Sequence, residues 1–155
     1  MENKKRTYSL WGLLTVAALV VCVAQVGSAR AEEIARPSNQ GDPGAAATMA
    51  GHAKAGAKIF ATNCLPCHGA QGKGGIPNPG SSDGTVPPLN PIDKTMVSKD
   101  AKVFAYNIDL FIQNGSTPEG PDPAIKMPAW GATKLLSQQQ IADVIAYVIR
   151  LNHAK

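Results

Sequence analysis

The pattern of apolar and polar positions predicts three helices, and the clearest of them lies near the C-terminus. Intervals of three and four residues separate Ile141, Val144, Ile145, Val148 and Leu151. Just before this apolar stripe, Ser137 and Gln140 have the spacing of a capping box, in which two side chains bond N–H groups at the start of a helix. We therefore expect an amphipathic helix that begins after Ser137, with Tyr147 beside its apolar stripe.

A second helix is predicted between Ser98 and Asn114. One of its faces carries Val103, Tyr106, Asn107, Leu110 and Phe111. Ser98 or Asp100 is the expected N-cap, and Gly115 follows the end of the helix.

A short helix is predicted from Gly51 to Asn63, where Gly56 and Phe60 lie four residues apart and share a face. A glycine inside a helix costs about 1 kcal/mol relative to alanine. That cost is understandable if another helix approaches closely at Gly56; the alternative is a helix that begins after this glycine. We expect Tyr147 to pack against the face that contains Gly56 and Phe60.

Between these helices the chain is predicted to form irregular loops. Six glycines lie between positions 69 and 84, and nine of the twelve prolines lie between Pro77 and Pro128. Long irregular loops are usually functional or disordered. The simplest function for these loops is to cover a flat cofactor.

The N-terminus has the pattern of an export segment. Basic residues at positions 4–6 precede an apolar run over residues 10–26, and Ala29 and Ala31 form a small-x-small cleavage site. Residues 1–31 are predicted either to be removed as a signal or to remain as a membrane anchor, because the apolar run is nearly long enough to span a bilayer. Either topology carries the rest of the chain out of the cytoplasm, into an oxidising compartment.

Residues 32–50 are polar and rich in Pro and Gly, so we expect a flexible linker there and one folded domain over residues 51–155. The net charge of +4 belongs mainly to the export segment. Without residues 1–31 the chain has 11 basic and 10 acidic side chains, a net charge of +1. Because no basic run is interleaved with aromatic residues, nucleic acid is not an expected partner.

The candidate chemistry is concentrated in the sequence Cys64-Leu-Pro-Cys67-His68. The spacing Cys-x-x-Cys-His is the attachment signature of c-type haem. Two thiols at this spacing can form thioethers with the two vinyl groups of one porphyrin, and the adjacent imidazole can bind the iron. The motif thus predicts one covalent haem c, anchored by Cys64 and Cys67, with His68 as an axial iron ligand.

Three other interpretations explain less of this motif. A redox-active Cys-x-x-Cys would be expected beside a strand, and no alternating apolar segment precedes Cys64. A zinc site needs four ligands, and outside the motif the chain offers only the isolated His52 and His153. A disulfide between Cys64 and Cys67 stays open for an exported protein, but it leaves His68 unexplained.

Met127 is the predicted sixth iron ligand. It follows the second predicted helix in an irregular loop, Pro128 stiffens its backbone, and Trp130 is close enough in sequence to line the same pocket. The alternative is that Met127 only fills space, as most methionines do. Met96 is a rival ligand, but its charged neighbours predict a surface loop.

The segment Val86-Pro-Pro-Leu89 is expected to place apolar groups on the ring. A proline carbonyl there could accept the second ring N–H of His68. Such a bond orients a ligating imidazole and raises its basicity.

Together these features resemble the class I cytochromes c. The resemblance is carried by the motif at 64–68, the Gly56 and Phe60 helix before it, the sequence Met127-Pro-Ala-Trp-Gly, and the terminal helix with Tyr147. It covers about residues 51–153.

The resemblance implies an all-α fold of three main helices, with long irregular loops wrapped around one covalent haem. It also implies that His68 and Met127 are the axial ligands, and that Pro87 rather than Pro88 supplies the carbonyl that faces His68. The Gly- and Pro-rich stretch from Lys73 to Gly84 departs from the family pattern.

With both axial positions filled, the iron has no open site for a substrate. The predicted function is therefore electron transfer rather than catalysis, in the periplasm or on the extracytoplasmic face of the membrane. Expected partners are redox proteins, either membrane respiratory complexes or periplasmic oxidoreductases, and the cytochrome c maturation machinery; the membrane is a partner only if the N-terminal segment is retained. Lys73 and Lys126 either help to dock an acidic patch of a partner or are ordinary surface lysines.

Two other functions remain open at the level of the sequence. A membrane-anchored haem subunit of a larger electron-transfer complex would keep the N-terminal segment. A haem enzyme or gas sensor would need an open iron site, and no distal His or Arg is recognisably placed for acid–base chemistry.

Overall fold

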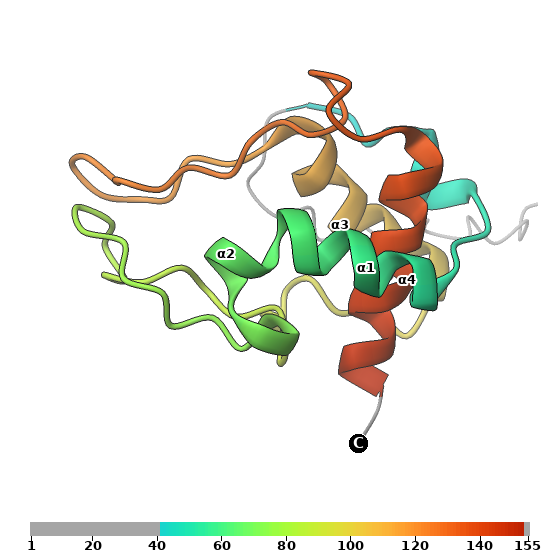
Figure 1. The fold of residues 1–155 in the computed structure, drawn as a ribbon, viewed down its shortest axis with the longest axis horizontal. Helices are drawn as coiled ribbons and strands as arrows, with labels where there is room; N and C mark the ends of the chain where they lie inside the picture. The colour runs from blue at the N-terminus through green and yellow to red at the C-terminus, as the bar shows by residue number, and fades with distance from the viewer. Residues whose placement is uncertain (1–40, 154–155) are drawn as a thin grey trace, which may run out of the picture. The chain divides into compact units, whose positions relative to one another are not determined.

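A computed structural model describes residues 41–153 of the chain. This part contains the α-helices α1 (Ala53–Asn63), α2 (Leu65–His68), α3 (Ala101–Asn114) and α4 (Gln138–His153) and the 3-10 helices η2 (Ala45–Thr48) and η3 (Ala70–Gly72). The predicted all-α fold is confirmed, with α1, α3 and α4 as its main helices (Figure 1). The predicted export segment, residues 1–31, and residues 32–40 of the predicted linker lie outside the described residues. None of the helices described is long and apolar enough to cross a membrane.

Helices α1 and α4 approach closely because α1 carries a glycine at the contact. A Cβ atom on Gly56 would collide with the backbone carbonyl of Asp143 in α4. One turn later, Phe60 is 2% exposed, and its ring centroid lies 5.2 Å from that of Tyr147. The predicted packing of Tyr147 against Gly56 and Phe60 is confirmed, and this contact joins the first and last α-helices of the described region (Figure 1).

The ends of the two longer helices are capped by side chains. At the start of α4, Ser137 N donates to Gln140 Oε1 at 2.8 Å and Gln140 N donates to Ser137 Oγ at 3.3 Å, so the predicted capping box is present. At the start of α3, the side chain of Asp100 accepts from Lys102 N, which makes Asp100 the N-cap rather than Ser98. Gly115, with φ 71°, ends the helix as expected.

The burial of α3 extends beyond the face that the sequence predicts. Its buried apolar residues are Phe104, Ile108, Leu110 and Ile112, joined by the polar Asn107 and Asp109. Val103, Tyr106 and Phe111, which the sequence groups on one face with Asn107 and Leu110, are half-buried. The reason is that α3 packs against both α4 and η2, so more of its circumference is covered than a single apolar stripe indicates.

Residues 41–50 are not the flexible linker that the sequence predicts. They contain η2, whose Ala46 is 1% exposed. Ala46 N donates to Gln138 Oε1 at 3.0 Å, and Ala47 N donates to Asp109 Oδ2 at 3.1 Å. This segment is held by hydrogen bonds from its backbone N–H groups to the side chains of Gln138 and Asp109 and by one small buried side chain. It therefore does not need the large apolar residues whose absence suggested disorder.

Candidate functional site

The residues with candidate chemistry converge on one pocket of about 440 Å³. Its walls come from the end of α1, α2, α3, α4 and the two long loops. The six side chains singled out in the sequence all line it, namely Cys64, Cys67, His68, Pro87, Met127 and Trp130. The rest of the lining is mainly apolar, with Phe60, Val86, Leu89, Ile92, Ile108, Phe111, Ile112, Val144 and Val148. The volume is in the usual range for a cofactor site of about 300–1,000 Å³.

One short helix places the attachment motif at this pocket. Cys64 ends α1, and Cys67 and His68 follow on α2, whose first turn tolerates Pro66 because the N–H that proline lacks has no helical partner there. His68 N donates to Cys64 O at 2.8 Å, so a single turn spans the motif.

Both cysteines of the motif are free thiols, and the disulfide that the sequence left open is not formed. Burial, together with the neighbouring Cys67, raises the pKa of Cys64 to about 11. An unreacted Cys64 is therefore a neutral thiol at pH 7.

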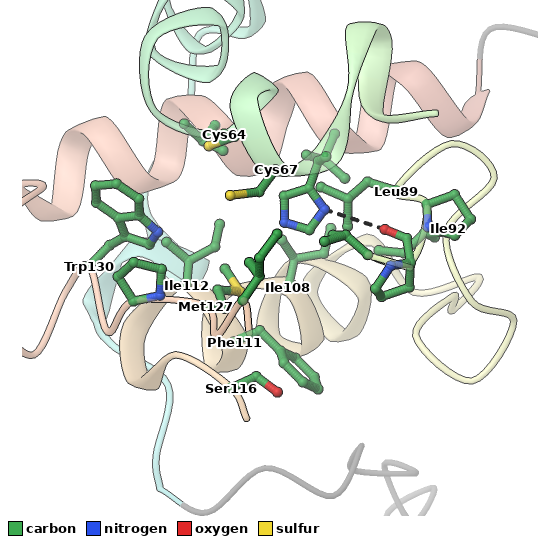
Figure 2. A pocket seen from close by; sticks show the side chains of 18 of the residues that line it. Cys64, Cys67, Leu89, Ile92, Ile108, Phe111, Ile112, Ser116, Met127 and Trp130 are labelled. Carbon is green, nitrogen blue, oxygen red and sulfur yellow. Dashed lines mark hydrogen bonds between the residues drawn. The ribbon is translucent and has the colours of Figure 1, made fainter. Parts of the chain in front are cut away.

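The imidazole of His68 is held from one side. Its Nδ1 lies 3.4 Å from the carbonyl oxygen of Pro87, a long hydrogen bond, marked by the dashed line in Figure 2. Burial lowers the pKa of His68, and the bond to Pro87 only partly offsets this. The ring is thus neutral, with its proton on Nδ1 facing a carbonyl that can only accept, and its Nε2 lone pair is available to a metal.

Met127 lies across the pocket from the two cysteines, beside Phe111 and Ser116 (Figure 2). Its backbone is paired with Ser116 by two hydrogen bonds, Met127 N to Ser116 O at 2.8 Å and Ser116 N to Met127 O at 3.1 Å. This antiparallel pair ties the half-buried Met127 to the end of α3.

The prediction that Met96 lies in a surface loop is wrong for the methionine itself. Met96 is 8% exposed and lines the same pocket. Its charged neighbours Asp93 and Lys94 are exposed, but a turn closed by Met96 N and Asp93 O directs the chain inward. Asn107 Nδ2 also donates to Met96 O at 3.0 Å. The thioethers of Met96 and Met127 therefore both line the pocket, although the sequence predicted a surface position for Met96.

The family model for cytochrome c matches residues 53–152. The chain belongs to the cytochrome c family. Members of this family bind haem covalently and are generally electron carriers.

This cytochrome is also similar to the cbb3-type cytochrome c oxidase subunit CcoP of Cereibacter sphaeroides, with 30% identity over 98 residues. The match covers 63% of the chain but only 30% of that subunit. No solved structure is significantly similar to the chain.

The pocket of this cytochrome fits a covalent haem. Two thiols, a neutral imidazole and a thioether lie among apolar walls, which suits a flat apolar macrocycle with an iron at its centre. Of the two lysines considered for partner docking, Lys126 is exposed and lines the pocket, whereas Lys73 is exposed and does not line it.

The sequence analysis missed a buried polar residue of the site, Asn78. It is 0% exposed, lines the pocket and bonds the backbone of Ile125 through both polar atoms of its side chain. Its position between two prolines in an aperiodic stretch offers no pattern by which burial could be predicted.

Proposed function

We propose that this cytochrome carries single electrons between redox partners through one haem c, which is held by Cys64 and Cys67 and has His68 and Met127 as its axial ligands. The observation that carries the proposal is the presence of all four side chains in the lining of a single apolar pocket. Ligation of the iron by both His68 and Met127 would leave no position for a substrate.

The bound haem supplies the one-electron chemistry, and the residues of the chain set its potential and access. The Pro87 carbonyl makes His68 a stronger donor, which favours ferric iron. The thioether of Met127 and the apolar walls act in the opposite direction, because they disfavour the additional positive charge of the ferric state. A Met/His pair raises the reduction potential relative to other ligand sets.

The optical spectrum of the haem-loaded protein tests this proposal. In the ferric wild type we expect a methionine-to-iron charge-transfer band, and in the ferrous protein no response to CO. Met127→Leu should lose the band and bind CO, because the thioether is then missing from the sixth position.

Met96→Leu is the matched control, since Met96 lines the same pocket. It should keep the band. Loss of the band in Met96→Leu and its retention in Met127→Leu would make Met96 the ligand. A high-spin wild type that binds CO would show an open iron site and replace the carrier by an enzyme or sensor.

A second candidate function is that of a fixed haem subunit in a larger electron-transfer complex. It is favoured by the similarity to CcoP, which is a subunit of an oxidase. We place the folded domain outside the cytoplasm in either case, as a soluble periplasmic protein if the chain is cleaved after Ala31 and as an anchored one otherwise. Mass spectrometry of the N-terminus of the native protein separates them: a mature chain that starts at Glu32 supports the soluble carrier, and an intact Met1 supports the anchored subunit.

A further inference from the structure

The stretch from Lys73 to Gly84 contains a fully buried polar side chain that haem attachment does not explain. Asn78 is 0% exposed although it lies in a loop rich in Gly and Pro. Ile125 N donates to Asn78 Oδ1 at 2.7 Å, and Asn78 Nδ2 donates to Ile125 O at 3.0 Å. The side chain of Asn78 therefore satisfies both backbone polar groups of one distant residue.

The backbone of Asn78 is fixed as well. Asn78 N donates to Gly84 O at 2.8 Å, and Ser81 donates to Asn78 O through its amide at 3.2 Å and through its hydroxyl at 2.8 Å. These bonds close the turn between the bridged residues Pro77 and Thr85. Hydrogen bonds within its own loop thus fix the backbone of Asn78, in addition to the bonds that its side chain makes with Ile125.

A second set of bonds joins this turn to the loop that follows α3. Ser82 N donates to Glu119 O at 2.7 Å, and Ala124 N donates to Pro79 O at 3.0 Å. The two loops extend together to one side of the helices (Figure 1). Their contact is close enough that a Cβ atom on Gly80 would collide with the carbonyl of Asp122.

The residue that Asn78 binds is two positions before Met127. The backbone N–H and C=O of Met127 are themselves both hydrogen-bonded to Ser116. Together, Ser116 and Asn78 hold residues 125–127 at two adjacent points, one from the end of α3 and one from the loop that begins after His68. Asn78 makes its contact through a fully buried side chain, whereas Ser116 is half-buried and bonds Met127 through its backbone.

We propose that Asn78, supplied by the Lys73–Gly84 stretch, is a positioning residue for the thioether of Met127. This inference rests on the proposed ligation of iron by Met127. Without the Asn78 side chain, both polar groups of Ile125 lose their partner and the 125–127 segment leaves the pocket more readily. The fraction of protein with Met127 off the iron then rises, and an added ligand that competes for the iron binds with higher apparent affinity.

The test is a titration of the ferric haem-loaded protein with free imidazole, followed by the loss of the methionine-to-iron band. Loss of two hydrogen bonds of ordinary net strength corresponds to a change of about tenfold or more in an opening equilibrium. We therefore expect the apparent dissociation constant for imidazole to fall by about tenfold or more in Asn78→Ala. Asn78→Leu, which keeps the volume but neither hydrogen bond, should show the same change.

The matched control is Asn107→Leu. Asn107 is also a buried asparagine that bonds a loop carbonyl, at 3% exposure, but its partner is Met96 O and it does not line the pocket. Its imidazole affinity should equal that of the wild type. Wild-type affinity in Asn78→Ala, or in Asn78→Leu alone, would overturn the inference, because the hydrogen bonds would then not hold the ligand.

Hydrogen exchange in the wild type tests the same point if the variants do not fold. The Ile125 amide should be protected in the methionine-ligated protein and should exchange faster once imidazole has displaced Met127. Unchanged protection would overturn the role of Asn78 while leaving the electron-carrier proposal intact. A wild type without the methionine band would instead remove the ligation on which both proposals depend.

Discussion

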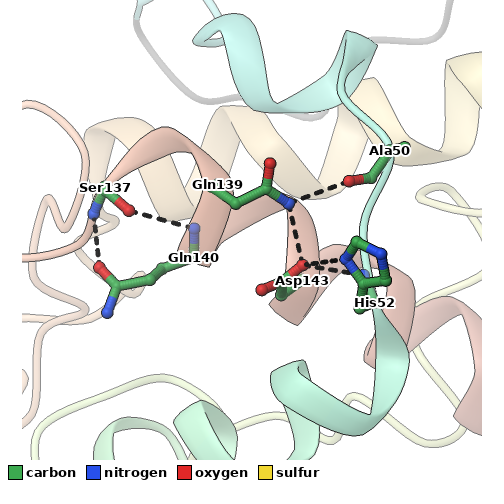
Figure 3. A network of polar contacts seen from close by, with 6 residues as sticks. All are labelled: Ala50, His52, Ser137, Gln139, Gln140 and Asp143. Carbon is green, nitrogen blue, oxygen red and sulfur yellow. Dashed lines mark hydrogen bonds and ion pairs between the residues drawn. The ribbon is translucent and has the colours of Figure 1, made fainter.

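At the scale of single residues, Asp143 of α4 binds the segment that precedes α1 through hydrogen bonds. Asp143 is 8% exposed, and its Oδ1 accepts from His52 N at 2.8 Å and from Gln139 Nε2 at 3.0 Å (Figure 3). Gln139 Nε2 also donates to Ala50 O at 2.9 Å. Burial by itself raises the pKa of Asp143, but these hydrogen bonds and the imidazole of His52 outweigh it, so that the pKa lies below its ordinary value.

Asp109 of α3 accepts a hydrogen bond from the N–H of Ala47, also before α1, but its pKa is shifted in the opposite direction to that of Asp143. It is 0% exposed, and burial raises its pKa, although backbone N–H groups of Ala47 and Gly44 partly offset the effect. Its Oδ1 is buried without a hydrogen-bond partner among the described residues. Ionised Asp109 is thus an incompletely compensated charge.

The two aspartates predict opposite pH dependences of stability. Because the folded pKa of Asp143 is lowered, its contribution is present above the ordinary carboxyl pKa of about 3.9 and is lost as pH falls through the folded value. Because the folded pKa of Asp109 is raised, stability falls as pH rises from about 3.9 through its folded value. Both effects can be measured by urea unfolding of the haem-loaded protein between about pH 3 and pH 7. In Asp143→Asn, the free energy of unfolding should decrease less at acid pH than it does in the wild type. In Asp109→Asn, the decrease in the free energy of unfolding at higher pH should disappear.

The control for this pair is Asp83→Asn, since Asp83 is an exposed residue of a turn. Its stability curve should run parallel to that of the wild type. Curves for Asp109→Asn and Asp143→Asn that are also parallel to the wild type would contradict both assignments.

At the scale of the elements, the contact between α1 and α4 depends on a single missing side chain. Gly56 lets the backbone of α4 approach, and Phe60 and Tyr147 then fill the space one turn away. The guanidinium carbon of Arg150 lies 5.5 Å from the centroid of the Tyr147 ring and covers it from outside. A methyl group at position 56 would meet a carbonyl rather than a flexible side chain, so the helices themselves would have to shift.

We expect Gly56→Ala to lower the free energy of unfolding by about 2 kcal/mol or more, although alanine is the better helix former by about 1 kcal/mol. Lys58→Ala, at an exposed position of the same helix, should change it by less than about 0.5 kcal/mol. Denaturant unfolding of the haem-loaded variants measures both values. A Gly56→Ala variant at least as stable as the wild type would show that the two helices can separate without loss.

At the scale of the whole molecule, the pocket is bounded by part of the hydrophobic core. Helices α1, α3 and α4 and both long loops turn apolar side chains toward it. Apolar side chains that stay in contact with water add nothing to the hydrophobic stabilisation of a fold. A bound haem would cover the apolar walls of the pocket and so complete the core of a small domain, which has little stability to spare.

The chain without haem is therefore expected to lack a cooperative fold. The double variant Cys64→Ala, Cys67→Ala removes both attachment points; far-ultraviolet circular dichroism should show much less helix and thermal unfolding no sharp transition. Cys64→Ala alone keeps one thioether and is the control, which should remain folded with haem. A cooperative transition in the haem-free double variant would mean that the helices and loops form a sufficient core by themselves.

The sequence by itself determined the three main helices, the capping box of α4 and the convergence of Cys64, Cys67 and His68, because these depend on residues a few positions apart. The roles of His68 and Met127 as iron ligands stay predictions that the spectrum will test. Only the tertiary structure decided which parts of the loops are buried. Asn78 bonds a residue 47 positions away, and Ala46 bonds one 92 positions away. Local patterns carry no information about such partners. For that reason residues 41–50 were expected to belong to a flexible linker, and Met96 to lie in a surface loop. Folding buries them because distant segments supply the hydrogen bonds and contacts that their own neighbours lack.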